Sequence, residues 1–165
     1  TSKDALQISK TRKINAINSI SEIKSESIDL ITAWHSIEHI HDIDKVFFDV
    51  KRILKTGKYL LLCVPNSDSI DQKYYNKDWV AWDAPRHLYH FNPNLLEKYV
   101  EKFSFEIVYI ESLLQDTAYN ILLSSGKKNI FRYLKSFYVL FISYFTILFS
   151  GYQKSSSFLV ICKKK

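Results

Sequence analysis

The sequence predicts an α/β protein whose sheet is largely parallel. Apolar residues alternate along the chain between runs with the spacing of strands and runs with the spacing of helices, and no internal repeat is evident. The chain has 165 residues, of which 47% are hydrophobic and 24% charged, as is typical of one globular domain with a buried core. We therefore expect one domain over residues 1–165.

The first predicted elements are a polar helix and two strands. Residues 3–12 have the composition of the end of a polar helix, and residues 13–18 (KINAIN) that of a short strand. Residues 27–34 (SIDLITAW) are mainly apolar or β-tolerant, which predicts a strand buried in a parallel sheet.

A helix and a second buried strand are expected next. Asp42 can cap a helix, and the apolar residues that follow it lie on one helical stripe: Ile43, Val46, Phe47, Val50, Ile53 and Leu54. The pair Thr56-Gly57 should end this helix. Residues 58–64 (KYLLLCV) then predict a strand that stops at Pro65.

Residues 66–91 are polar and aromatic without a clear period, which indicates an ordered lid rather than a simple connection. Asn92 and Pro93 predict the start of a helix, as N-cap and first helical residue. Strands are expected at residues 105–110 and 157–162.

Charge is distributed unevenly along the chain. Residues 117–165 contain eight Lys or Arg and no Asp or Glu, although the whole chain has a net charge of only +6. This asymmetry indicates an anionic partner, such as a membrane surface or nucleic acid, whereas solubilising lysines are the alternative. The uncharged stretch at residues 136–150 is shorter than the roughly 20 residues that span a bilayer.

Both cysteines, Cys63 and Cys162, lie inside apolar runs, which predicts buried thiols in a reducing compartment. No signal peptide is visible near Thr1, and we expect a cytoplasmic protein. The sequence contains no Met, so we interpret its start as a truncation.

Two segments carry a family resemblance. The sequence IDLITAWHSIEHIHDIDKVFFDVKRILKTGKYLLLCVPN resembles class I S-adenosylmethionine (SAM)-dependent methyltransferases, in the branch that includes ubiquinone-type O-methyltransferases. The later sequence WDAPRHLYHFNPNLLEKYVEKFSFEIV resembles the lid, helix and sixth strand of uncharacterised methyltransferases that are often encoded beside surface-polysaccharide genes. The resemblance implies a Rossmann-like fold with strand order 3-2-1-4-5-7-6, here lacking strands 1 and 2 and the Gly-rich cofactor loop. Residues 117–150 would then be a hydrophobic helical insertion between strands 6 and 7 of a partial domain.

The resemblance also implies an activity. The chain would transfer a methyl group from SAM to an oxygen or carbon of a saccharide, a lipid-linked or a quinone-like acceptor. A noncatalytic membrane-surface module, derived from a truncated or decayed methyltransferase, is the alternative. Nucleic acid is a weaker expectation, because no aromatic stacking platform alternates with the C-terminal basic residues.

The resemblance assigns cofactor contacts to two places. The end of strand four, with Ala33, Trp34 and His35, should contact the methionine end of SAM, and Asn18 and Ser19 should touch the adenine. Trp34 could equally be a core aromatic residue.

A divalent metal is a further expectation. His35, Glu38 and His39 are spaced i, i+3 and i+4, so a helical turn would direct all three to one face, where they could ligate a metal. The spacing is similar to the metal-binding E-x-x-E-H motif of the ubiquinone and small-RNA 2′-O-methyltransferases, with His35 in place of the first Glu. His39 could instead act as general base, or Glu38 and His39 could simply orient the neighbouring loops.

The lid supplies further site residues. His87 or His90 could act as base or as an extra metal ligand, and Arg86 could pair with a phosphate or carboxylate of the substrate. The catalytic candidates are His39, His87 and His90, and the substrate-binding candidates are Trp79, Trp82, Arg86 and Tyr89. Alternatively, the lid is a loop anchored by its own hydrogen bonds.

The apolar segment predicts a surface role. In the expected fold strands six and seven pair with each other, so a single membrane span between them would separate them. Residues 127–150 could lie in the plane of a membrane surface, with Lys127, Lys128, Arg132 and Lys135 near the headgroups. This would make the protein peripheral to the inner face of the membrane. A helical pair that closes the lid, or a dimer interface, is an equal alternative.

Overall fold

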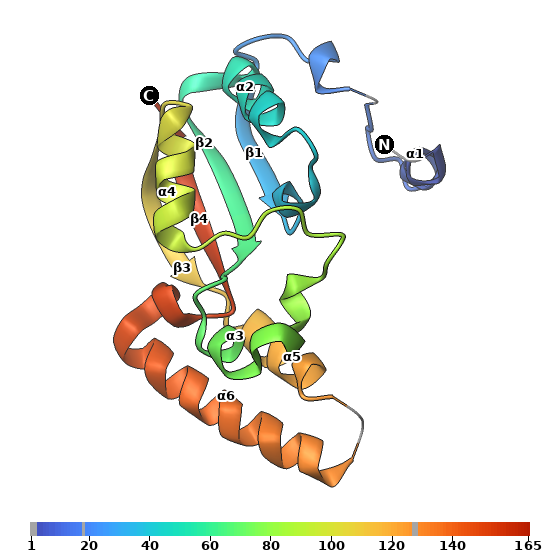
Figure 1. The fold of residues 1–165 in the computed structure, drawn as a ribbon. Coiled ribbons are helices and arrows are strands. Elements are labelled where there is room, and N and C mark those ends of the chain that lie inside the picture. Colours follow the sequence, from blue (N-terminus) through green and yellow to red (C-terminus); the bar gives the residue numbers. More distant parts are fainter. Residues whose placement is uncertain (1–2, 18, 127–128) are drawn as a thin grey trace.

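The computed structural model describes residues 3–17, 19–126 and 129–165, and shows a four-stranded sheet flanked by helices (Figure 1). The strands are β1 (Ile28–Trp34), β2 (Leu54–Pro65), β3 (Phe105–Ser112) and β4 (Ser157–Lys164). The α-helices are α1 (Lys3–Thr11), α2 (Ile43–Ile53), α3 (Ile70–Tyr75), α4 (Pro93–Lys102), α5 (Leu114–Ser124) and α6 (Ile130–Ser150). Short 3-10 helices are η1 (Ile20–Glu22), η2 (Ile37–His39), η3 (Asn76–Asp78), η4 (Val80–Trp82) and η5 (Gly151–Lys154).

The strand order is β1-β2-β4-β3. Strand β2 runs parallel to β1, and β4 runs antiparallel to both β2 and β3. This is the 4-5-7-6 half of the expected order, so the predicted Rossmann-like fold is confirmed. Strand β1 is an edge strand, and its Leu30 and Trp34 are 56% and 52% exposed.

Two sequence predictions of local structure are wrong. Residues 13–17 do not form a strand, because no strand in the described part of the chain pairs with them and an isolated strand leaves its backbone groups without partners. The helix expected to end at Thr56-Gly57 ends at Ile53 instead. Leu54 already pairs with Ile28 of β1, and its carbonyl accepts a hydrogen bond from Lys164 Nζ at 2.7 Å, so sheet formation overrides the helical pattern.

Helices α2 and α4 cover the same face of the sheet. Their predicted caps are confirmed: the Asp42 side chain accepts from the backbone NH of Lys45, and Asn92 precedes Pro93 at the start of α4. Phe47 of α2 packs against Tyr99 of α4, with ring centroids 5.1 Å apart. The contact belongs to the main hydrophobic core, which joins both helices to β2, β3 and β4.

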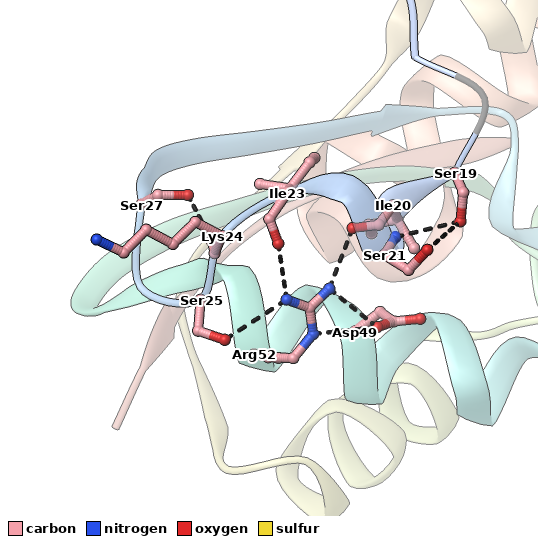
Figure 2. Close-up of polar contacts among 9 residues, drawn as sticks. All are labelled: Ser19, Ile20, Ser21, Ile23, Lys24, Ser25, Ser27, Asp49 and Arg52. Carbon is pink, nitrogen blue, oxygen red and sulfur yellow. Dashed lines mark hydrogen bonds and ion pairs between the residues drawn. The ribbon is translucent and has the colours of Figure 1, made fainter.

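Arg52 attaches the segment before β1 to α2 (Figure 2). Its guanidinium donates to the carbonyls of Ile20 and Ile23, at 3.0 and 2.7 Å, and pairs with Asp49 at 3.2 Å. Ser19 caps η1 on the same segment, where its hydroxyl accepts from Ser21 N. One half-buried side chain therefore fixes the chain that enters the edge strand.

A second group of helices lies at the end of the sheet where β1 and β2 terminate (Figure 1). It consists of α3, η3 and η4 from the lid, together with α5 and α6, around a second hydrophobic cluster: Tyr75, Trp79, Ala81, Ile121 and Val139. Trp79 Nε1 donates to the buried Asp71 carboxylate at 2.6 Å. The lid is thus an ordered segment with its own helices and anchors, and α5 and α6 form the helical connection between β3 and β4.

Candidate functional site

A cavity of about 320 Å³ opens where β1 and β2 end, between the lid and α5. Twelve residues line it: His35, Pro65, Val80, Ala81, Asp83, Arg86, His87, Asp116, Tyr119, Asn120, Leu123 and Ser157. In open α/β sheets, ligands bind in the crevice beyond the carboxyl ends of the strands. The cavity therefore occupies the position in which this architecture holds its substrates.

His35 is the first residue after β1, and its backbone is in the left-handed region with φ of +41°. Strained backbone of this kind concentrates at functional sites. The conformation accompanies contacts of the imidazole with β2 and α5: Nε2 lies 2.8 Å from Asp116 Oδ2 and 3.2 Å from Cys63 Sγ. Nδ1 lies 3.6 Å from Glu38 Oε1.

These contacts keep His35 protonated. The hydrogen bond with Asp116, followed by the contacts with Cys63 and Glu38, raises the pKa of His35 to about 12. Burial alone would raise the pKa of Asp116, but the hydrogen bond with His35 brings it below the ordinary value. The pair is therefore an imidazolium and a carboxylate at neutral pH, and His35 is unsuited to act as a general base.

Glu38, which contacts His35 Nδ1, is buried and only 1% exposed. Neither of its carboxylate oxygens has a hydrogen-bond partner among the described residues. Glu38, His39 and His87 each offer a ligand atom, and these atoms lie within 4.8 Å of one another. The structure therefore brings His87 together with Glu38 and His39, while His35 belongs to a separate cluster with Cys63 and Asp116.

Backbone carbonyls orient the rings of His39 and His87. His39 Nδ1 lies 3.0 Å from the carbonyl oxygen of Arg86, and His87 Nδ1 lies 2.8 Å from that of Ala81. A carbonyl oxygen only accepts, so each Nδ1 carries the hydrogen, and in the neutral ring Nε2 keeps its lone pair. Both histidines thus retain a nitrogen that can accept a proton or bind a metal.

The other lid candidates differ in position. Arg86 is exposed, lines the cavity and pairs with Asp83 at 2.7 Å. His90 packs edge-on against Trp82 outside the cavity lining, and burial, with the nearby His87, lowers the pKa of His90. Tyr89 donates its hydroxyl to the carbonyl of His41. The remaining candidate, Trp79, is buried in the second hydrophobic cluster and does not face the cavity.

The candidates for cofactor contact lie near the edge strand. Trp34 is half exposed at the end of β1, so the alternative that it is a core aromatic residue is wrong. Ala33 is partly buried beside it. Ser19 forms the N-cap of η1, and Asn18 lies outside the described residues.

Sequence reasoning did not single out Asp83, Asp116 or Asn120, which line the cavity. A signal for Asp116 does exist: it lies in the first turn of α5, immediately after β3, which runs in the same direction as β2. Polar residues after the carboxyl ends of parallel strands converge on one edge of a sheet. Asp83 resembles His35 in having a left-handed backbone, with φ of +39°.

Comparison with known proteins agrees with this architecture. The model of a methyltransferase-domain family matches residues 4–110. A SAM-dependent methyltransferase from Thermotoga maritima, described as a possible histamine N-methyltransferase, superposes with a TM-score of 0.66 at 17% identity, over 99% of this chain and 70% of that one. A SAM-dependent methyltransferase from Archaeoglobus fulgidus gives 0.59 at 17% identity, over 99% of this chain and 73% of that one.

A third similar structure is phosphoethanolamine N-methyltransferase 2 from Haemonchus contortus in complex with SAM. Its TM-score is 0.55 at 18% identity, over 97% of this chain and 40% of that one. No curated protein matches this chain in sequence. The family match covers well over half of the chain, and the chain therefore belongs to the class I SAM-dependent methyltransferases.

Proposed function

We propose that this methyltransferase uses the cavity between the lid and α5 to bind a small hydroxylated acceptor, and that a saccharide fits it best. The observation that carries the proposal is the lining, in which His35, Asp116 and Asn120 provide hydrogen-bonding groups beside apolar residues of the lid and α5. A sugar needs several such groups and an apolar surface for its ring face. A quinone-like acceptor would use fewer of them, whereas the sugar of a lipid-linked acceptor would use the same ones.

The reaction needs positioning and one proton acceptor. The acceptor oxygen attacks the methyl carbon of the sulfonium, so that a C–O bond forms while the C–S bond breaks and its electron pair stays on sulfur. The hydroxyl proton is transferred to His87 Nε2, which has a lone pair in the neutral ring because Nδ1 donates its hydrogen to the carbonyl of Ala81, and which lies 3.8 Å from Asp83 Oδ2. His87 lines the cavity, whereas His39 and His90 do not, so it is the favoured base among the three catalytic candidates.

On the cofactor side, Trp34 and Ala33 are proposed to contact the methionine end of SAM. Their position at the carboxyl end of the edge strand, next to His35, supports this assignment. The imidazolium of His35 would then lie between cofactor and acceptor, where it can donate a hydrogen bond but not remove a proton.

The test combines binding and turnover on the full-length protein. Isothermal titration measures SAM affinity, and transfer of a radiolabelled methyl group to a panel of sugars and sugar nucleotides measures activity. The expected results are SAM binding, labelled O-methyl sugar, and a loss of at least 100-fold in kcat for His87→Ala with SAM affinity unchanged. Methylation of quinols but no sugar would contradict the proposed acceptor, and absence of SAM binding would contradict the cofactor site.

A second role for the same cluster is a divalent metal site. The buried carboxylate of Glu38 favours it, because neither oxygen accepts a hydrogen bond from the described residues, His35 Nδ1 lies 3.6 Å away, and a metal would coordinate the carboxylate directly. His39 and His87 would complete three ligands, each with its Nδ1 hydrogen donated to a carbonyl as in many metal sites. When bound, such an ion would supply a Lewis acid for the acceptor oxygen.

Chelation separates the two roles. If His87 acts as a base, EDTA should leave turnover unchanged. If the cluster binds a metal, EDTA should abolish turnover and Mg²⁺ or Mn²⁺ should restore it in the wild type but not in Glu38→Gln.

A further inference from the structure

We infer that α6 docks in the plane of an anionic membrane surface through an exposed apolar stripe. This function is separate from the proposed reaction, and no residue of the stripe lines the cavity between the lid and α5. Helix α6 contains 21 residues and no acidic side chain.

The stripe follows the helical repeat along the whole of α6. Its members are large apolar side chains that are each more than half exposed: Ile130, Phe131, Tyr133, Leu134, Phe137, Tyr138, Phe141, Phe145, Leu148 and Phe149. Phe137 and Leu148 are 72% and 77% exposed, which is unusual for residues of this type in a folded protein. A contiguous apolar surface of this extent marks an interaction site.

The opposite face of α6 is fixed to the body of the protein. Its buried residues are Arg132, Val139, Ser143 and Ile147. Arg132 donates to the carbonyl of Leu122 in α5 at 2.7 Å, and the Tyr144 hydroxyl donates to the carbonyl of Leu114 at 3.0 Å. The helix therefore has one protein-facing side and one solvent-facing apolar side.

The attachment of α6 to the body of the protein indicates that the helix lies on a membrane rather than crosses it. The segment Ile130–Lys154 is long and apolar enough to cross a bilayer by length and composition alone, and 22% of its most apolar window is buried. However, both ends of α6 stay on the same body: α5 precedes it, and η5 leads directly into β4 of the sheet. Crossing would require the buried face to leave α5, whereas docking in the plane uses only the exposed stripe.

Charge favours an anionic lipid surface over a second copy of the chain. Helix α6 and η5 contain Arg132, Lys135 and Lys154 and no Asp or Glu, so this helical segment attracts negative charge and two copies of it repel each other. Lys135 lies on the flank of α6, with its ammonium 4.8 Å from the centroid of the Tyr75 ring. Lys127 and Lys128 precede α6 in the sequence, outside the described residues. A stripe of Phe, Leu and Tyr beside basic residues is the composition of interfacial helices.

Docking would also orient the cavity. Helix α5 lines it with Tyr119, Asn120 and Leu123, and the same helix packs against α6. Figure 1 shows α6 beyond α3 and α5, at the end of the sheet where β2 terminates. A docked α6 would therefore hold this end of the sheet toward the lipid headgroups.

Cosedimentation of the full-length protein with vesicles tests the inference. One set contains phosphatidylcholine alone, and the other contains 30% phosphatidylglycerol. The double variant Phe137→Ser/Leu148→Ser removes two exposed stripe residues, and Leu95→Ser/Val108→Ser removes two exposed apolar residues elsewhere, 49% and 48% exposed. All four positions are at the surface, and circular dichroism checks that each variant folds.

The expected result is binding to anionic vesicles at least tenfold tighter than to neutral ones, weakened at 0.5 M salt. The stripe variant should lose at least tenfold in affinity and the control variant less than twofold. Equal binding of both double variants would overturn the inference. So would a dimer in sedimentation velocity that only the stripe variant dissociates, without vesicle binding by the wild type, because the stripe would then be a contact between copies.

Discussion

His35 Nε2 lies 2.8 Å from Asp116 Oδ2, although 81 residues separate the two in the sequence. The pair connects the end of β1 to the start of α5 across the wall of the cavity. The pair therefore contributes both to the stability of the fold and to the shape of the site. The protonation of His35 should make the stability depend on pH.

We predict that the stabilisation from His35 declines as the pH rises above neutrality. The pKa of His35 is raised to about 12 in the folded protein, so its contribution is complete below the ordinary value near 6.5 and is lost as pH rises toward the folded value. The free energy of unfolding of wild type minus that of His35→Gln should fall between pH 6 and pH 9. The slope should be below about 1 kcal/mol per pH unit, because His35 is 40% exposed and solvent screens it.

Asp116→Asn provides the control for this titration. Without the carboxylate, the largest cause of the raised pKa of His35 is gone. The difference in free energy of unfolding between Asp116→Asn and the double variant His35→Gln/Asp116→Asn should therefore change much less with pH. Urea denaturation at four pH values gives both differences. An equally steep slope in the two comparisons would show that Asp116 does not hold the proton on His35.

The fold was predictable from the sequence because its strongest signals are local. The apolar stripe after Asp42 and the Asn92-Pro93 pair each predict a helix from residues that are close together in the sequence. The structure confirms both helices. The wrong predictions concern residues whose structure depends on pairing with a strand that is distant in the sequence. Leu54 continues the helical pattern but pairs with β1, and residues 13–17 have strand-like composition without a strand to pair with.

Arg52 should be the residue on which the segment before β1 depends. We predict that Arg52→Ala lowers the free energy of unfolding by about 2–3 kcal/mol, since it removes charged hydrogen bonds to the carbonyls of Ile20 and Ile23 and the pair with Asp49. Hydrogen exchange should accelerate at the amides of residues 20–27 more than in the sheet. Arg52→Lys keeps the charge without the fork and should recover less than half of the loss; full recovery by lysine would contradict the geometry in Figure 2.

Glu38 offers a test of the cluster that does not depend on activity. In protein treated with chelator, Glu38→Gln should melt at or above the wild-type temperature, because the amide removes a buried charge that accepts no hydrogen bond from the described residues. If the cluster binds a divalent metal, added Mn²⁺ should raise the melting temperature of the wild type alone. A large fall in melting temperature for Glu38→Gln in chelator would mean that the 3.6 Å contact with His35 already compensates the charge.

The site was only partly predictable because its members come from separate segments. The spacing of His35, Glu38 and His39 suggested one cluster, but η2 turns Glu38 and His39 toward the lid, while His35 turns toward α5. Nothing local to residues 35–39 indicates that Asp116 completes one cluster and His87 the other. These partners follow from the folding of the lid and of α5 over the end of the sheet.

The lid should lose its anchor when Trp79 loses its indole nitrogen. Trp79 Nε1 donates to Asp71 Oδ2 at 2.6 Å, and both residues are buried, so Trp79→Phe leaves a buried carboxylate with one fewer donor. We predict a loss of about 1.5–3 kcal/mol in the free energy of unfolding, measured by urea denaturation. Trp82→Phe is the matched control, because Trp82 Nε1 donates to the carbonyl of Asn76 at the exposed surface, and it should cost less than about 1 kcal/mol. Equal losses in the two variants would mean that packing of the ring, rather than the bond to Asp71, holds the lid in place.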